Sequence, residues 1–150
     1  MALVALIGWL ATAGGGLYLL AVWLIEYDRD YQATAATRLP VPVIGTHALL
    51  ATAGLVVWSA YLLLGDQVLA WTAVVILACV AALGAAMAMR WFRTYRSTRQ
   101  RSRGAAAPSP GQRGVAPERN FPLPIVIGHG LLAAVTIVLV LLTALGVNRG

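Results

Sequence analysis

Charge is scarce in this sequence, and lysine is absent altogether. Only 11% of its 150 residues are charged, with 11 arginines and 5 acidic residues, against about 25% in a soluble domain. The acidic residues all fall outside the long apolar stretches: Glu26, Asp28, Asp30, Asp66 and Glu118. The apolar stretches therefore lack the paired carboxylates of hydrolytic chemistry and the charged stations of an ion path.

Cysteine is nearly absent as well, since Cys79 is the single one in the chain. One cysteine cannot form an internal disulfide, a Cys-x-x-Cys redox pair or the two-cysteine attachment site of a c-type haem. A lone cysteine usually behaves as a small buried apolar side chain. We expect that role for Cys79.

Apolar residues make up 60% of the chain, and its mean hydropathy is +0.80. They gather in four stretches of roughly 20–25 residues, each long enough to cross a hydrocarbon core about 30 Å thick. The stretches are residues 2–25, 41–64, 68–89 and 123–147. The sequence thus predicts an all-α integral membrane protein, a single domain over residues 1–150 with four transmembrane helices in a four-helix bundle.

The arginines indicate how these helices are oriented. All but Arg149 lie in the two segments that join the first stretch to the second and the third to the fourth. Cytoplasmic loops of membrane proteins carry an excess of basic residues, so we expect both joining segments in the cytoplasm and both termini outside. A composition rich in Ala, Gly and Arg without Lys is typical of a GC-rich bacterial genome, which predicts the bacterial inner membrane.

The second joining segment, about residues 93–119, is expected to be a flexible basic loop, because its later part is rich in Gly, Ala, Pro and Ser. Its arginines abut a membrane helix and belong to no recognisable nucleic-acid-binding module. We therefore expect contact with anionic lipid headgroups and predict no nucleic-acid partner, although the net charge is +6.

An internal repeat is the most informative feature of the sequence. Residues 40–51 (PVPVIGTHALLA) and 122–133 (PLPIVIGHGLLA) share both prolines, the histidine and the final Leu-Leu-Ala at an ungapped offset of 82 residues. In each copy the histidine, His47 or His129, follows the second proline by five residues. The second and fourth stretches therefore look like copies of one helix.

A fainter echo joins the first and third stretches at an offset of 68 residues. Gly16, Trp23 and Tyr27 correspond to Gly84, Trp91 and Tyr95. The sequence thus predicts a duplicated helical hairpin whose two copies cross the membrane in the same direction. We expect the two tryptophans at the cytoplasmic interface. The two glycines either allow tight helix crossing or give a flat cofactor room against bare backbone.

The prolines set the depth of the histidines. Proline is accepted in the first turn of a helix, so each histidine should lie about 10 Å inside its helix. Steps of three and four residues from each histidine reach small, hydroxyl-bearing and aromatic side chains, which favour helix packing in lipid. These are Val43, Ala51, Gly54, Trp58 and Tyr61 in one helix and Ile125, Ala133, Thr136, Val140 and Thr143 in the other. We expect both histidines to point into the bundle, toward each other.

Two histidines at one depth in membrane helices favour a haem site. Ionisable residues there are costly and usually functional, and an iron between His47 and His129 would give one nitrogen of each a partner. Axial ligation by two side chains suits electron transfer. The leading hypothesis is haem b held by these two histidines, with Arg38 and Arg119 pairing with its propionates. In outline, this scheme is similar to small membrane b-type cytochromes.

Three other interpretations stay open. Each histidine can be a structural residue bonded to a carbonyl or hydroxyl of a neighbouring helix. A histidine can instead bind the headgroup of a quinone. The chain can also be a non-catalytic accessory or assembly subunit of a larger membrane complex, or form a homo-oligomer. Because it has no large extramembrane segment, we expect an electron carrier or a subunit rather than a stand-alone enzyme.

Overall fold

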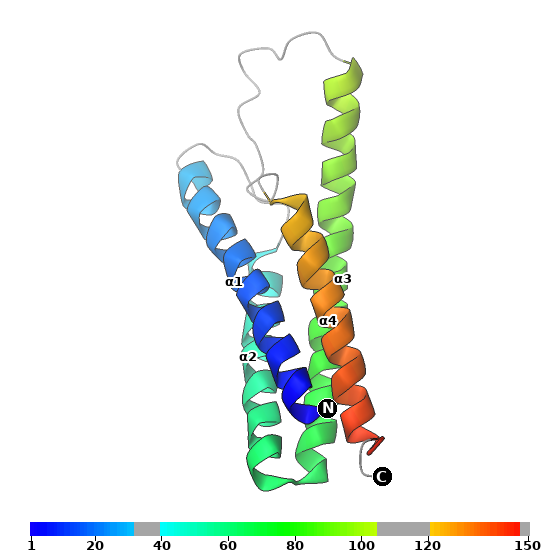
Figure 1. Ribbon diagram of the computed structural model, residues 1–150. Coiled ribbons are helices and arrows are strands. Elements are labelled where there is room, and N and C mark those ends of the chain that lie inside the picture. The colour runs from blue at the N-terminus through cyan, green and yellow to red at the C-terminus, as the bar shows by residue number, and fades with distance from the viewer. Residues whose placement is uncertain (32–39, 105–120, 148–150) are drawn as a thin grey trace.

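A computed structural model describes residues 1–31, 40–104 and 121–147 of the chain. These residues form helices joined by short connections: α1 (Ala2–Tyr31), α2 (Val41–Leu64), α3 (Gln67–Gly104) and α4 (Leu123–Ala144) (Figure 1). Each of the four contains a stretch that is long and apolar enough to cross a membrane. The prediction of an all-helical chain with four such helices is therefore confirmed for the described residues.

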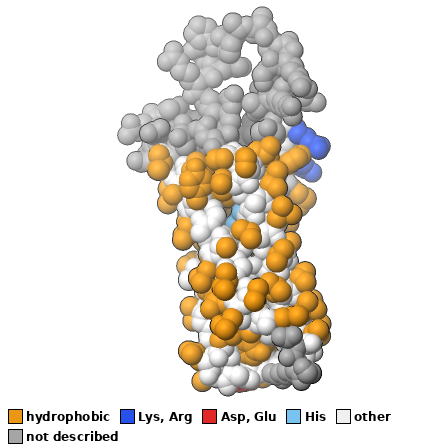
Figure 2. All heavy atoms as spheres, viewed as in Figure 1, with side chains coloured by type: hydrophobic (Ala, Val, Ile, Leu, Met, Phe, Trp, Pro, Cys, Tyr) orange, Lys and Arg blue, Asp and Glu red, His pale blue; other side chains and the backbone are white. Residues whose placement is uncertain are grey.

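The outer surface of the helices suits a lipid environment. Large apolar side chains are exposed along all four helices, and they cover the face shown in Figure 2. Two of the exposed hydroxyls are satisfied within their own helix: Thr52 donates to the carbonyl of Ala48 at 3.0 Å and Thr72 to that of Val68 at 2.8 Å. A hydroxyl bonded within its own helix presents no unpaired polar group to hydrocarbon.

The helix ends follow local sequence rules. Pro40 and Pro122 precede α2 and α4 with matching extended conformations (φ −63°, ψ 121° and φ −65°, ψ 118°). Each is followed by a proline in the first turn, where the missing amide proton costs nothing. Gly65 ends α2 in the left-handed conformation (φ 71°), and its amide donates to the carbonyl of Tyr61 at 2.9 Å. The Gly65–Asp66 connection then turns the chain directly into α3.

Two helices are longer than predicted and one is shorter. α1 continues to Tyr31, and α3 continues through the basic segment 93–104, which we expected to begin a flexible loop. No proline or glycine occurs between Ala85 and Arg103, and Arg and Gln are good helix formers. α4 ends at Ala144 because Gly146 adopts φ 74°. The rest of the predicted loop lies outside the described residues.

The helices associate in two closely packed pairs. α1 packs along α4 and α2 packs along α3, whereas the contacts α1·α2 and α3·α4 are less extensive (Figure 1). Each pair therefore joins one helix of the first predicted hairpin to one helix of the second. The less extensive α1·α2 and α3·α4 contacts form the seam between the two pairs.

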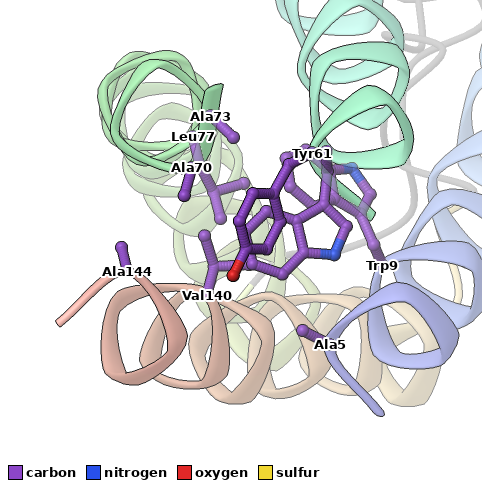
Figure 3. Packing of buried hydrophobic residues seen from close by; sticks show 9 residues of the cluster. Ala5, Trp9, Tyr61, Ala70, Ala73, Leu77, Val140 and Ala144 are labelled. Carbon is purple, nitrogen blue, oxygen red and sulfur yellow. The ribbon is translucent and has the colours of Figure 1, made fainter. Parts of the chain in front are cut away.

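The hydrophobic core lies at the end of the bundle where α2 turns into α3. Trp58 is fully buried there, with its ring centre 4.9 Å from that of Tyr61, and its indole nitrogen donates to the carbonyl of Ala2 at 3.3 Å. Around them lie mostly small and aliphatic side chains (Figure 3). The cluster comprises Ala5, Trp9, Trp58, Tyr61, Ala70, Ala73, Leu77, Val140 and Ala144.

Burial repeats at the two offsets seen in the sequence. Gly54, Trp58 and Tyr61, the buried residues of α2, each lie 82 residues before a buried residue of α4: Thr136, Val140 and Thr143. Ala5, Trp9 and Trp23 of α1 lie 68 residues before buried Ala73, Leu77 and Trp91 of α3. Inward residues follow each other at alternating steps of four and three, the 3.5-residue spacing of left-handed helix bundles.

Two expectations about single side chains need correction. Cys79 is exposed on α3 rather than buried, because it falls between the inward residues Leu77 and Val80 and faces outward. Trp23 and Trp91 are each only 4% exposed. Both indole rings are therefore buried within the protein, whereas we had expected them to lie in an interfacial belt that faces the lipid.

Candidate functional site

The two histidines meet inside the bundle. His47 of α2 and His129 of α4 are both partly buried, their ring centres are 6.4 Å apart, and their ring planes meet at 62°. Both histidines stand seven residues after the proline that precedes their helix. The equal spacing gives them the same depth, and the inward face gives them the same direction, as the sequence predicted.

His129 packs against the backbone of α1. Its Nδ1 atom lies 2.9 Å from the carbonyl oxygen of Thr12. The ring edge lies over Gly16, where an added Cβ would be 3.0 Å from the Cε1 atom of His129. Gly15 is close as well, with its hypothetical Cβ at 3.6 Å from the same side chain. Only a helix without side chains at this point lets the imidazole approach so near.

His47 packs against α3 in the same way. Its Nδ1 atom lies 3.1 Å from the carbonyl oxygen of Val80, and a Cβ added to Gly84 would be 3.2 Å from its Cε1 atom. Val80 and Gly84 stand 68 residues after Thr12 and Gly16, the residues that contact His129. The same module of histidine, carbonyl and glycine therefore occurs twice.

Each module has a simple physical cause. A helical carbonyl already accepts the amide four residues later, and it keeps a second lone pair. An imidazole that reaches this lone pair must pass over the residue at that later position, which is Gly16 beside Thr12 and Gly84 beside Val80. Since glycine has no side chain, the hydrogen bond can form from a neighbouring helix.

The two carbonyl contacts fix the protonation pattern of the rings. A carbonyl oxygen only accepts, so in a neutral imidazole Nδ1 carries the proton and Nε2 carries the lone pair. Histidines that bind metals through Nε2 are commonly held in this tautomer by an Nδ1–H bond to a carbonyl or carboxylate. His47 and His129 thus each present a lone pair on the nitrogen that these hydrogen bonds do not use.

The histidines face each other across the seam between the helix pairs. His129 is anchored within the α1·α4 pair and His47 within the α2·α3 pair. A flat ligand between the two rings would lie along this less tightly packed seam. Two apolar layers bound the site along the helices. Seven residues beyond Gly16 and Gly84 lie the buried residues Trp23 and Trp91. Seven residues before the same glycines lie the buried residues Trp9 and Leu77.

The ligand set limits what the site can hold. No group of three or more His, Cys, Asp and Glu side chains suited to a metal ion occurs among the described residues. Structural metal ions usually take four protein ligands and catalytic ones three. Two imidazole lone pairs suit a ligand that brings further donor atoms of its own, as the macrocycle of a haem does.

Sequence reasoning located part of this arrangement. The structure brings His47, His129, Gly16 and Gly84 together. The glycines were expected to allow tight helix crossing or to give a flat cofactor room, and in the structure they contact the imidazoles themselves. The carbonyls of Thr12 and Val80 were missed, because a backbone acceptor leaves no side-chain signature; the 68-residue offset was the one available signal. Arg38 and Arg119 lie outside the described residues.

Hydroxyl groups continue from His129 toward the hydrophobic core. The Oγ1 atoms of Thr12 and Thr136 lie 3.4 Å apart, and each hydroxyl also donates at 2.8 Å to a carbonyl of its own helix, that of Gly8 or Leu132. Both hydroxyls are therefore satisfied without a ligand. Because each has a single proton, which it gives to its own helix, the two oxygens are in close contact where α1 packs on α4 and do not share a hydrogen bond.

No family model, curated protein or solved structure matches this chain. The fold and the site therefore define its class by themselves. The chain is an all-α protein with four helices long and apolar enough to span a membrane, and its two histidines are paired between them.

Proposed function

We propose that this protein is a membrane b-type cytochrome that transfers electrons through one haem held by His47 and His129. The observation that carries the proposal is the separation of 6.4 Å between the two ring centres. With metal–nitrogen bonds of about 2 Å, and ring centres about 1 Å behind the ligating nitrogens, two axial imidazoles stand about 6 Å apart. A separation of this size would allow His47 and His129 to hold a haem between them.

The surrounding residues would hold and orient the ligands. The carbonyls of Thr12 and Val80 keep the Nδ1 protons in place, and Gly16 and Gly84 let each ring seat against a helix. When bound, a haem with two axial side chains supplies one-electron chemistry and leaves no open position for oxygen. The apolar layers on either side would keep water from the site.

The wider setting forms part of the same proposal. We propose a duplicated hairpin embedded in the bacterial inner membrane, with the histidine-bearing ends of α2 and α4 toward the cytoplasm and both termini outside. This orientation follows from the arginines near those ends. Arg38 and Arg119 would pair with the propionates. Anionic lipid headgroups would contact the arginines nearest the membrane, and the chain would work within a larger complex or a homo-oligomer.

Absorption spectroscopy tests the proposal directly. Detergent-purified protein supplied with haem should show a b-type spectrum on dithionite reduction, with about one haem per chain in a pyridine haemochrome assay. His47→Ala and His129→Ala should each lose the haem. His129→Gly should regain it on addition of imidazole, because the free ligand can occupy the vacated space. Cys79→Ser, outside the site, is the matched control and should keep the spectrum.

Two results would overturn the haem assignment. One is wild-type protein that remains colourless after reconstitution with haem. The other is full haem content in His129→Ala, since a single histidine would then suffice and the pairing would be structural.

A quinone site is the second candidate. The histidines are only partly buried, and a histidine is visible from outside in Figure 2, between apolar side chains. The reduced headgroup of a membrane-dissolved quinone could reach such an imidazole laterally and donate a hydrogen bond to the Nε2 lone pair. A colourless protein that co-purifies with quinone and loses it in the His129→Ala variant would favour this function. If the His129→Ala variant loses neither haem nor quinone, an accessory or assembly subunit becomes the favoured function.

A further inference from the structure

One face of α3 joins apolar and basic side chains where the apolar span of the helix ends. The span ends at Arg93, and the spacing of Met89, Phe92, Arg93 and Arg96 places all four on the same side of a helix. Met89 and Phe92 are 60% and 42% exposed, and both arginines are exposed as well. Figure 2 shows arginine side chains next to apolar ones at this end of the bundle. We call these four residues the α3 boundary face.

One arginine of the boundary face is already held in place. The Cζ atom of Arg96 lies 4.7 Å from the centre of the Phe92 ring, within the range of a cation–π contact. The Phe92 ring in turn meets buried Trp91 edge to face, with ring centres 5.9 Å apart and ring planes at 67°. The guanidinium group therefore rests on a ring that is itself packed against the protein, and it loses less freedom when it binds an anion.

The two guanidinium groups favour an anion as their partner. Neither Arg93 nor Arg96 has an acidic partner among the residues that the structure describes, and the sequence of α3 contains no acidic residue. The two arginines are three positions apart, about 4.5 Å along the helix axis, so both side chains can reach one phosphate group. Arginine binds phosphate through charge-assisted hydrogen bonds. A phosphate at this point would also relieve the repulsion between like charges three residues apart.

The apolar half of the boundary face indicates which kind of phosphate fits. A soluble anion would leave Met89 and Phe92 exposed to water, whereas the acyl chains of a lipid would cover them at the end of the apolar span. The charge of the headgroup narrows the choice further. Phosphatidylethanolamine and phosphatidylcholine carry an ammonium group, which would meet two arginines of like charge and no carboxylate on α3. The headgroup of phosphatidylglycerol carries no such cation.

We propose that the α3 boundary face binds the headgroup of one anionic phospholipid, with its phosphate between Arg93 and Arg96 and its acyl chains over Phe92 and Met89. This site rests on the membrane setting of the proposed function and not on the haem. It narrows the general contact with anionic headgroups to one position on one helix. Because Phe92 packs against Trp91, the bound lipid also supports the apolar layer beside the histidine pair.

Native mass spectrometry of the full-length protein in detergent tests the site. Protein equilibrated with phosphatidylglycerol and phosphatidylethanolamine of equal acyl composition should retain one phosphatidylglycerol in preference. R93Q/R96Q should weaken this retention about 25-fold, because each arginine near an anionic surface contributes about fivefold. The matched control R101Q/R103Q removes the same charge from the same helix beyond the apolar span, and it should retain the lipid like wild-type. F92L removes the ring beneath Arg96 and should weaken retention about two- to fivefold.

Three results would overturn the proposal. Equal loss of lipid in the R93Q/R96Q and R101Q/R103Q variants would show an unspecific attraction to net charge. Equal retention of the two lipids by wild-type protein would exclude selection of the headgroup. Displacement of phosphatidylglycerol by inorganic phosphate would show a site for a free anion.

The lipid site and the haem site can fail independently. Haem content is measured by absorption, and the haem-free His47→Ala variant should retain phosphatidylglycerol like wild-type. A colourless protein that still selects this lipid through Arg93 and Arg96 would therefore overturn the haem proposal alone. Protein that stays soluble without detergent would overturn the membrane setting, and the lipid site with it.

Discussion

Replacing Gly16 by Ala gives the sharpest test of how the histidines are held. The added Cβ would lie 3.0 Å from the Cε1 atom of His129, whereas carbon atoms normally meet at about 3.5–4.0 Å. The imidazole must therefore retreat by a few tenths of an ångström. Its hydrogen bond to the carbonyl of Thr12, now 2.9 Å, would lengthen toward the usual limit of about 3.2 Å.

Two opposing terms set the size of the effect. Overpacking costs about 1–3 kcal/mol, while exchanging glycine for alanine within a helix gains up to about 1 kcal/mol. The net loss for Gly16→Ala is thus about 1 kcal/mol. Gly14→Ala is the matched control two residues away, because nothing lies within 4 Å of its Cβ. The Gly14→Ala variant should show the gain from alanine alone. The free energies of unfolding of the two variants should therefore differ by about 2 kcal/mol.

Thermal unfolding in detergent measures this difference, which corresponds to roughly 4–8 °C between the two midpoints. Haem retention should separate them further, because loss of a hydrogen bond behind a metal ligand typically costs about 10- to 100-fold in affinity. Gly84→Ala should behave like Gly16→Ala but more mildly, since its Cβ would lie 3.2 Å from His47. Equal midpoints and equal haem content for Gly14→Ala and Gly16→Ala would refute the close approach of His129 to α1.

The remaining predictions concern the packing around the site. Gly54→Ala should lower the free energy of unfolding by about 1–3 kcal/mol, because its Cβ would lie 2.9 Å from the indole of Trp9. Gly45→Ala, with open space around it, should not destabilise the fold in a chemical denaturation series. Trp58→Phe should lower the unfolding midpoint through loss of volume and of the indole hydrogen bond. Thr52→Val, on the outer surface, should leave the midpoint unchanged.

The sequence predicted that the two histidines meet because each step of that prediction depends on residues close together in the chain. Two prolines fix where α2 and α4 begin, a constant spacing fixes the depth of His47 and His129, and the small and hydroxyl-bearing residues mark the inward face. The buried residues Gly54 and Thr136 both lie on the faces chosen in this way. Periodicity and spacing were enough for this part of the site.

What could not be predicted depends on contacts between helices. The pairing of α1 with α4 and of α2 with α3 decides which carbonyl each histidine meets, and no local pattern encodes it. Thr12 and Val80 share no side-chain chemistry, because their role belongs to the backbone. The length of α3 was underestimated for another reason: the loop predicted from the Gly-, Ala-, Pro- and Ser-rich later part of the segment was extended back over its arginine-rich start, although arginine itself favours the helix.

Packing between the two halves that the sequence predicts to be copies is complementary rather than identical, and this explains how unequal halves bring His47 and His129 together. Gly8 of α1 faces Thr136 of α4, with a hypothetical Cβ at 2.9 Å from its hydroxyl oxygen, and Gly54 of α2 faces Ile76 of α3 at 3.0 Å. Gly8 corresponds to Ile76 at the 68-residue offset, and Gly54 to Thr136 at the 82-residue offset.

These two contacts each join a glycine of the first predicted copy to a larger residue of the second, while Trp9 of the first copy also packs against Gly54, 2.9 Å from its hypothetical Cβ. Two first copies would set Gly8 against Gly54 and leave a void, which costs stability because lost contacts are not replaced. Two second copies would set Ile76 against Thr136 and overfill the same layer. Close packing therefore favours one copy of each kind, and it places His47 and His129 in the same molecule, each on the glycine-lined helix of the other half.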